Sequence, residues 1–303
     1  MHVLVTGASG WIGSAVVPEL LAAGHRVTGV ARSDASARAL TAAGAAVLTG
    51  SLDDLDVLRS GAEQADAVVH LAFKHDLTFS GQGAAAADAD RAAVQVFIDA
   101  LAGSDRPMVI ASGVLGLTPG RLATEEDGRV VEGDPQGVLA RHHTAQLTLE
   151  AADRGVRSVV VRLSPSVHAE GDNGFLPALV TAARQSGSSA YVDDGAARWP
   201  AVHRADAARL FRLALEQAPA GSVLHAVAEE GVPVRHIAAA IGRATGLPVT
   251  SIPAADADAR FGFLGGLLSL DSPTSSARTQ ELLGWTPTHP TIVEDLDAGR
   301  YTR

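Results

Sequence analysis

Three glycines near the amino terminus narrow the choice of fold more than any other residues. Residues 5–13, with the sequence VTGASGWIG, follow an apolar run at 3–5 and precede valines and leucines at 16–21 that repeat at helical spacing. The first glycine permits a tight turn, the second lets the backbone approach a ligand closely, and the third lets the helix pack on the strand. A strand, glycine loop and helix in this order predict a site for the pyrophosphate of a dinucleotide at the helix amino terminus.

Short apolar runs alternate with helical patterns over the first 165 residues. Within each run, successive residues are apolar rather than alternately apolar and polar, as expected of strands that are covered on both faces. The runs lie at residues 3–5, 27–30, 46–48, 67–71, 108–111 and 159–163. This alternation predicts an α/β fold, a Rossmann-type doubly wound parallel sheet.

The second half of the chain has shorter strand signals and more glycine, serine and proline. Strands are expected at 191–192, 223–227 and 249–252, and helices at 205–216, 237–244 and 279–283. We therefore expect an NAD(P)-binding domain at 1–165 and a smaller substrate-covering region at 166–303, parts of which return to the main sheet.

Composition limits the classes of function. The chain has no cysteine, which excludes disulfides, thiolate metal ligands and cysteine nucleophiles, and no metal site is expected. Its net charge of −10 argues against nucleic acid as a partner. No signal peptide or membrane-spanning run is apparent, so a cytoplasmic location is the expectation.

The end of the second expected strand bears on the choice of cofactor. Arg32 and Ser33 stand where an acidic residue would accept a hydrogen bond from the ribose 2′-hydroxyl of NAD. A guanidinium suits a 2′-phosphate instead, so the sequence favours NADP(H) over NAD(H). Asp34 lies close by, and a solvated strand end is the alternative interpretation of Arg32.

Several motifs resemble the extended and atypical short-chain dehydrogenases, the group that contains the NAD-dependent epimerase/dehydratase proteins. Besides the glycine loop they are SLDD at 51–54, DAVVHLA at 66–72, VRLSP at 161–165, residues 199–206 and LGWTP at 283–287, so the resemblance spans nearly the whole chain. It implies a cofactor site made of Gly7, Ser9, Gly10, Trp11, Ile12, Gly13, Leu52, Asp53, Leu71, Ala72 and Phe73. Dimers are common in that group, so a homodimer is compatible with the resemblance.

Two further residues take their expected roles from the resemblance. Ser112, just after the fifth strand, matches the serine that hydrogen-bonds the substrate oxygen. Lys74 is the only lysine in the chain and lies in a loop where related epimerases use a lysine to reach the cofactor phosphates. We expect Lys74 to hold the pyrophosphate or the nicotinamide ribose, with an exposed loop lysine as the alternative.

The chain departs from the group at its catalytic pair. Those enzymes use Tyr-x-x-x-Lys on the helix after the fifth strand, whereas the two tyrosines here, Tyr191 and Tyr301, are both elsewhere. Aligning Glu150 with the acidic position that follows the pair puts His142 in the tyrosine place. A shift by one turn puts Val138 there and His142 in the lysine place, and the sequence does not decide between the two registers.

Histidine is a suitable substitute acid because its pKa ordinarily lies near 6.5. We expect His142 to move the proton while Ser112 orients the substrate; a surface histidine pair is the alternative. His168 is a candidate for the pocket beside the nicotinamide, or else a capping or core histidine. Tyr191 and Trp199 are candidates for the pocket lining, or else ordinary core residues.

These observations predict an NADP(H)-dependent oxidoreductase that reduces a small carbonyl or an imine. Two other functions remain open at this point. A nucleotide-sugar epimerase or dehydratase fits the resemblance but relies on the missing tyrosine. A non-catalytic redox sensor that binds NADP fits the absence of the pair.

Overall fold

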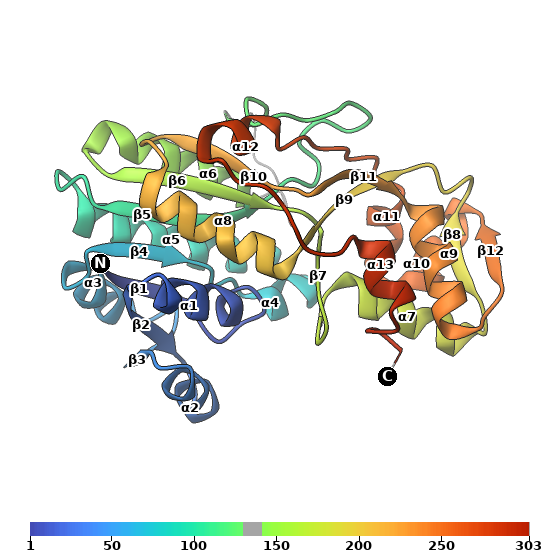
Figure 1. Ribbon diagram of the computed structural model, residues 1–303, viewed down its shortest axis with the longest axis horizontal. Coiled ribbons are helices and arrows are strands. Elements are labelled where there is room, and N and C mark those ends of the chain that lie inside the picture. The colour runs from blue at the N-terminus through green and yellow to red at the C-terminus, as the bar shows by residue number, and fades with distance from the viewer. Residues whose placement is uncertain (130–140, 303) are drawn as a thin grey trace.

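In a computed structural model, which describes residues 1–129 and 141–302, seven parallel strands form the central sheet (Figure 1). Their order is β10-β6-β5-β4-β1-β2-β3. The strands are β1 (His2–Thr6), β2 (Arg26–Ala31), β3 (Ala46–Thr49), β4 (Ala67–His70), β5 (Pro107–Gly113), β6 (Arg157–Leu163) and β10 (Ser222–Ala226). The strand order reverses between β1 and β4, and ligands of such sheets bind outside the carboxyl ends of the strands at this switch point. The expected Rossmann-type fold is confirmed.

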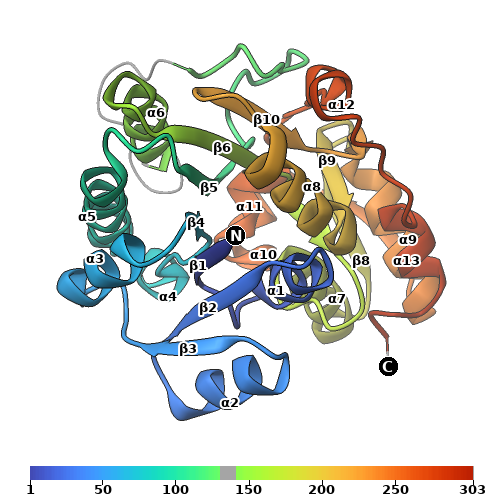
Figure 2. The same cartoon turned by 60° about the vertical axis from the view of Figure 1, so that its left-hand side comes forward.

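Helices cover both faces of this sheet, so the central residues of its inner strands are buried. All four residues of β4 are buried, as are the five central residues of β6. Figure 2 shows α1 and α8 on one side of the sheet and α3, α5 and α6 on the other. These helices are α1 (Gly13–Ala22), α3 (Leu55–Glu63), α5 (Gly83–Leu101), α6 (Arg141–Glu150) and α8 (Arg204–Gln217). Within the described ranges, no helix has both the length and the apolar character that crossing a membrane requires.

Short elements complete the part of the chain before β7. They are α2 (Asp34–Ala42), α4 (His75–Phe79) and the 3-10 helix η2 (Ala151–Arg154).

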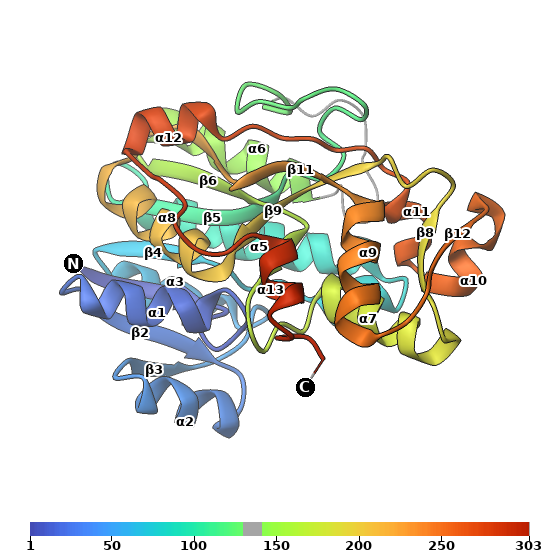
Figure 3. The same cartoon turned by 45° about the vertical axis from the view of Figure 1, so that its right-hand side comes forward.

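A smaller lobe lies beside the sheet and holds most of the second half of the chain (Figure 3). Its strands form two small sheets, β11-β9-β7 and β12-β8. Its elements are β7 (Ser166–His168), α7 (Phe175–Ser186), β8 (Ser189–Val192), β9 (Arg198–His203), β11 (Glu229–Pro233), α9 (Val234–Thr245), β12 (Val249–Ile252), η3 (Ala254–Asp256), α10 (Ala257–Phe261), α11 (Leu264–Leu268) and α13 (Ile292–Asp297). A separate apolar cluster, with Trp199 and Ile292 among its members, forms the core of this lobe.

The chain passes between the lobe and the large sheet more than once. After β9 it enters α8, and β10 then pairs with β6 at the edge of the large sheet. Helix α12 (Ala277–Leu283) also packs against β10 and α8, whereas α13 returns to the lobe (Figure 1). The strands expected at 191–192, 223–227 and 249–252 correspond to β8, β10 and β12.

Candidate functional site

The glycine loop between β1 and α1 packs tightly against the end of β4. Gly7 has φ +63°, and a Cβ there would lie 2.6 Å from the backbone nitrogen of Ala72. A Cβ at Gly13 would lie 2.1 Å from the carbonyl oxygen of Gly7. No side chain caps α1, so the loop leaves backbone N–H groups at the helix amino terminus for an anion. This cradle fits the pyrophosphate of a dinucleotide.

Trp11 connects the glycine loop to the second half of the chain through hydrogen bonds and a stacking contact. Its indole nitrogen donates to the carbonyl oxygen of Val167 at 2.8 Å. The guanidinium of Arg204, the first residue of α8, lies 4.1 Å from the centre of the indole ring and donates to the Trp11 carbonyl oxygen at 2.6 Å. It also donates to the Ser14 hydroxyl. Nothing in the local sequence indicates this role of Arg204, which comes from 193 positions away.

Two arginines that follow β2 have no carboxylate partner among the described residues. Arg32 is exposed and forms no ion pair within residues 1–129 and 141–302; the same is true of Arg38 on α2, which the sequence analysis did not single out. The hydroxyl of Ser33 caps α2 by accepting from the backbone N–H of Ser36 at 3.2 Å. A phosphate at the end of β2 would lie beside the guanidinium of Arg32.

The structure pairs two residues that the sequence placed separately at the cofactor. Lys74 donates to both carboxylate oxygens of Asp53, at 2.6 and 2.7 Å, and so joins the loop after β4 to the loop after β3. Leu52, which directly precedes Asp53, is buried, with 8% of its surface exposed. The ammonium group of Lys74 is therefore held at the carboxyl edge by a partner that itself remains exposed.

A buried hydrogen-bond chain fixes the backbone after β4. The Thr6 hydroxyl accepts from the backbone N–H groups of Leu71 and Ala72, at 3.2 and 3.3 Å, so its own proton points to Nδ1 of His70 at 2.7 Å. His70 then carries its proton on Nε2 and donates to Asp90 at 3.1 Å. These hydrogen bonds hold in place the segment from Leu71 to Ala72, which is expected to belong to the cofactor site.

Asp90, which accepts the last of these hydrogen bonds, remains ionised although it is only 2% exposed. Burial alone would raise the pKa of its carboxyl group. The hydrogen bond from His70 and the positive charge of Arg141 outweigh burial and hold that pKa below its ordinary value.

Ser112 and His142 come to the same edge of the sheet. Ser112 is 2% exposed at the end of β5, and its hydroxyl has no hydrogen-bond partner in the described part of the chain. The ring of His142 is hydrogen-bonded to the backbone of Gly113, the residue after Ser112. The alternative register involved Val138, which lies outside the described residues.

The environment of His142 differs from the one the sequence suggested. Burial, and then the charges of Arg162 and Arg141, lower the pKa of His142 to about 4 despite its bond to Gly113. The expectation of an ordinary pKa near 6.5 is therefore not met. At neutral pH the ring is uncharged, which makes it an acceptor or a neutral donor in the resting site.

Arg141, immediately before His142, lies deeper in the site than the sequence indicated. Its Nη2 donates to the carbonyl oxygen of Ala111 at 2.7 Å, and its Cζ lies 4.2 Å from the centre of the Phe73 ring. The only indication of this role in the sequence is that Arg141 directly precedes two histidines. The geometry shows that this cation bridges the ends of β4 and β5.

His168 lies inside the protein. It is 1% exposed, and its Nδ1 lies 2.7 Å from a carboxylate oxygen of Asp295 on α13. Its Nε2 is buried with no partner in the described ranges. The ring packs edge-on against His203 at 5.5 Å, so His168 links β7, β9 and the carboxyl-terminal helix.

Trp199 and Tyr191 belong to the apolar cluster of the smaller lobe. Trp199 is 1% exposed, and its indole nitrogen donates to the carbonyl oxygen of Leu267 at 3.2 Å. Tyr191 is half-buried at the margin of the same cluster. Both side chains contribute to the core that supports the lobe.

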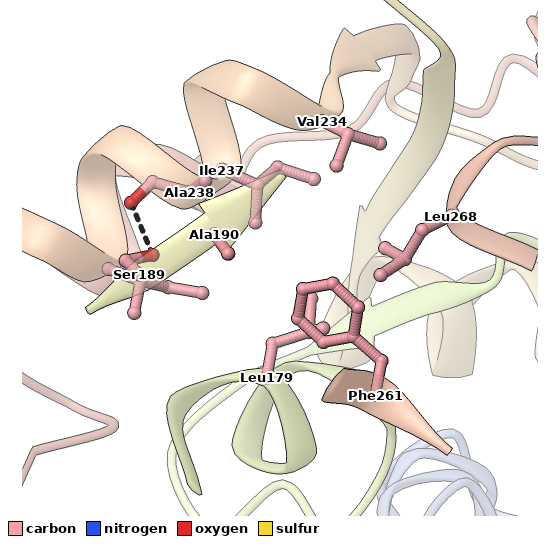
Figure 4. A pocket seen from close by; sticks show the side chains of 9 residues that line it. Leu179, Ser189, Ala190, Val234, Ile237, Ala238, Phe261 and Leu268 are labelled. Carbon is pink, nitrogen blue, oxygen red and sulfur yellow. Dashed lines mark hydrogen bonds between the residues drawn. The ribbon is translucent and has the colours of Figure 1, made fainter. Parts of the chain in front are cut away.

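A small apolar cavity lies within this lobe (Figure 4). Leu179, Val234, Phe261 and Leu268 point into it, and the hydroxyl of Ser189 instead donates to the carbonyl oxygen of Ala238 at 2.8 Å. Its volume is about 10 Å³, roughly the space for one water molecule. This cavity is a packing gap and not a substrate pocket.

Known proteins resemble the chain over its whole length. The model of the NAD dependent epimerase/dehydratase family matches residues 3–227. An uncharacterized protein of Schizosaccharomyces pombe is 44% identical over 99% of this chain and 100% of its own length. A ketoreductase of Stigmatella aurantiaca, which acts on 4-hydroxy-2-methyl-3-oxo-4-farnesyl-3,4-dihydroquinoline-1-oxide, is 30% identical over 77% of this chain and 70% of its own length.

Among solved structures, the dTDP-glucose 4,6-dehydratase DesIV of Streptomyces venezuelae, determined with NAD bound, has the same fold. It superposes with a TM-score of 0.79 at 20% identity and covers 99% of this chain and 96% of its own. The family match, which takes in the glycine loop, the seven-stranded sheet and the edge with Ser112 and His142, gives the assignment: the chain belongs to the NAD dependent epimerase/dehydratase family.

Proposed function

We propose that the protein is an NADPH-dependent reductase of a small carbonyl compound or an imine. The observation that carries this proposal is the buried hydroxyl of Ser112, which has no hydrogen-bond partner among the described residues, next to Gly113, to whose backbone the ring of His142 is hydrogen-bonded. A buried hydroxyl with no partner is costly, and a substrate oxygen or nitrogen would satisfy it. The ketoreductase among the relatives supports the same class of reaction.

The preference for NADP(H) is supported by the end of β2. Arg32, just before α2, and Arg38, within α2, are exposed cations without ion pairs in the described ranges. The cofactor site we propose also includes the glycine loop (Gly7, Ser9, Gly10, Trp11, Ile12 and Gly13), Ser33, Leu52, Asp53, Leu71, Ala72, Phe73 and Lys74. Residues 1–165 would hold the cofactor and 166–303 would cover the substrate, in a cytoplasmic protein that would form a homodimer.

In the proposed mechanism the bound nicotinamide supplies the hydride. The Ser112 Oγ–H donates to the substrate oxygen and holds it at the end of β5. The ring of His142 delivers the proton that the developing alkoxide takes up. Because its pKa is about 4, only a small fraction of His142 is protonated at neutral pH.

The experiment is NADPH oxidation against a panel of carbonyl compounds and imines, followed by variants on any substrate found. Ser112→Ala and His142→Gln should each lower kcat by about 100-fold or more and leave the dissociation constant of NADPH unchanged. His143→Gln makes the same substitution one residue further along α6 and should keep kcat within about twofold of the wild type.

Two outcomes would replace the proposal. Protein that binds NADPH well and oxidises it with no member of the panel supports the redox sensor, which the absent Tyr-x-x-x-Lys pair favours. Protein that is purified with oxidised cofactor bound and does not exchange it supports an epimerase or dehydratase.

A further inference from the structure

The guanidinium of Arg141 is a positive charge held at the catalytic edge by groups that do not neutralise it. It donates to the backbone carbonyl of Ala111 and stacks on Phe73, both of which are uncharged. Its Nε is buried and has no hydrogen-bond partner in the described part of the chain. Burial lowers its pKa, but a guanidinium stays protonated in proteins.

The carboxylate whose charge attracts Arg141 makes its hydrogen bond elsewhere. No carboxylate forms an ion pair with Arg141 within residues 1–129 and 141–302. The one whose charge attracts it, Asp90, accepts the hydrogen bond from His70 instead. The guanidinium of Arg141 therefore has no ion-pair partner among the described residues at the ends of β4 and β5, although the ionised carboxylate of Asp90 attracts it.

This position is the nicotinamide end of the proposed cofactor site. Ala111 directly precedes Ser112, and Phe73 directly follows the segment tied to Thr6. A dinucleotide whose pyrophosphate lies at the glycine loop, with its adenosine half toward β2, extends its other half across the switch point toward β4 and β5. Arg141 would thus lie near the ring that changes charge in the reaction.

We propose that Arg141 makes this site select reduced nicotinamide over oxidised nicotinamide. The inference rests on the proposed function, because it requires NADP(H) to bind here. The oxidised ring carries a positive charge and the reduced ring is neutral, so a buried cation repels only the oxidised form. Such a site favours binding of NADPH and release of NADP⁺ after each turnover, as a reductase requires and as an epimerase that retains oxidised cofactor does not.

The test compares the dissociation constants of NADP⁺ and NADPH, measured by quenching of tryptophan emission or by calorimetry. The wild type should bind NADPH more tightly. Arg141→Gln, which removes the charge, should lower the ratio of the NADP⁺ constant to the NADPH constant by about tenfold, about 1.4 kcal/mol. Arg141→Lys keeps the charge and should keep the ratio within about threefold of the wild type.

Arg204→Gln is the matched control. Arg204 also stacks on an aromatic ring and donates to a backbone carbonyl, but it does so at the pyrophosphate loop. Its removal should weaken binding of NADPH and NADP⁺ by the same factor and leave their ratio unchanged.

Three results would overturn the inference: an unchanged ratio in Arg141→Gln, an equal change of the ratio in Arg141→Lys, or an equal change in Arg204→Gln. Thermal unfolding of each variant shows whether it is folded, and Arg141→Met serves as the neutral variant if Arg141→Gln unfolds. If the wild type binds neither NADPH nor NADP⁺, the proposed function fails. If it binds both and only the ratio test fails, the role of Arg141 alone is refuted.

Discussion

Protonation of His225 should make the protein sensitive to acid. This side chain is fully buried in β10, with Nδ1 2.8 Å from the carbonyl oxygen of Ser275, so Nδ1 carries the proton. Nε2 lies 3.4 Å from the guanidinium of Arg162 and must accept. Burial and the positive charge of Arg162 lower the pKa of His225 to about 4. The carboxylates of Glu125 and Asp127 act to raise it but do not outweigh burial.

The lowered pKa of His225 determines how the free energy of unfolding changes with pH. The folded protein resists taking up a proton that the unfolded chain binds below about pH 6.5. The stability that His225 contributes is thus fully present above pH 6.5, declines as the pH falls, and is lost by about pH 4. At pH 5, about 1.5 pH units below the unfolded pKa, the loss is about 2 kcal/mol at about 1.36 kcal/mol per unit.

Urea unfolding at pH 7 and pH 5 measures this loss. His225→Asn keeps an N–H donor for Ser275 but cannot titrate, so its free energy of unfolding should fall between the two pH values by about 2 kcal/mol less than that of the wild type. His236→Asn makes the same change at an exposed position on α9 and should retain the wild-type difference. An equal pH dependence in His225→Asn and the wild type would refute the reasoning.

Further predictions concern the candidate site. Gly13→Ala places a Cβ 2.1 Å from a loop carbonyl oxygen and should weaken NADPH binding at least about 100-fold. Gly266→Ala, whose Cβ would have no atom within 4 Å, should leave the affinity for NADPH unchanged. Equal affinities of the two variants would contradict the close packing of the glycine loop. Lys74→Ala frees Asp53 and removes a cation from the edge, so the dissociation constant of NADPH should rise about tenfold; an unchanged constant would rule out its role. If His142 supplies the proton, kcat should rise as the pH falls from 7 toward the His142 pKa of about 4; a flat profile that His142→Gln shares would exclude it.

The large sheet could be predicted because each of its strands carries its own signal. Continuous apolar runs such as 67–71 and 159–163 can be buried only between two layers of helices, and the glycine loop fixes which strand comes first. The strands β7, β9 and β11 were not expected. β7 has only three residues, and β9 begins Arg198-Trp199-Pro200, so polarity and proline mask its strand pattern.

The candidate site could be predicted only where one short segment supplies it. The glycine loop and Ser112 are local features; the structure places the loop after β1 at the switch point and Ser112 at the end of β5. Arg141, Arg204 and Asp90 were not identified because their roles depend on partners from other elements. The lowered pKa of His142 likewise arises from tertiary burial and the charge of Arg162, which the sequence of α6 does not contain.

Titration of the purified protein with NADPH and separately with NADH, followed by quenching of tryptophan emission, tests the central claim most directly. Trp11 lies within the glycine loop and should report occupancy. We expect NADPH to bind at least tenfold more tightly than NADH, about 1.4 kcal/mol, and Arg32→Ser to remove most of this difference. Equal affinity or a preference for NADH would contradict the assignment of the end of β2 to a 2′-phosphate, and binding of neither would contradict the cofactor site itself.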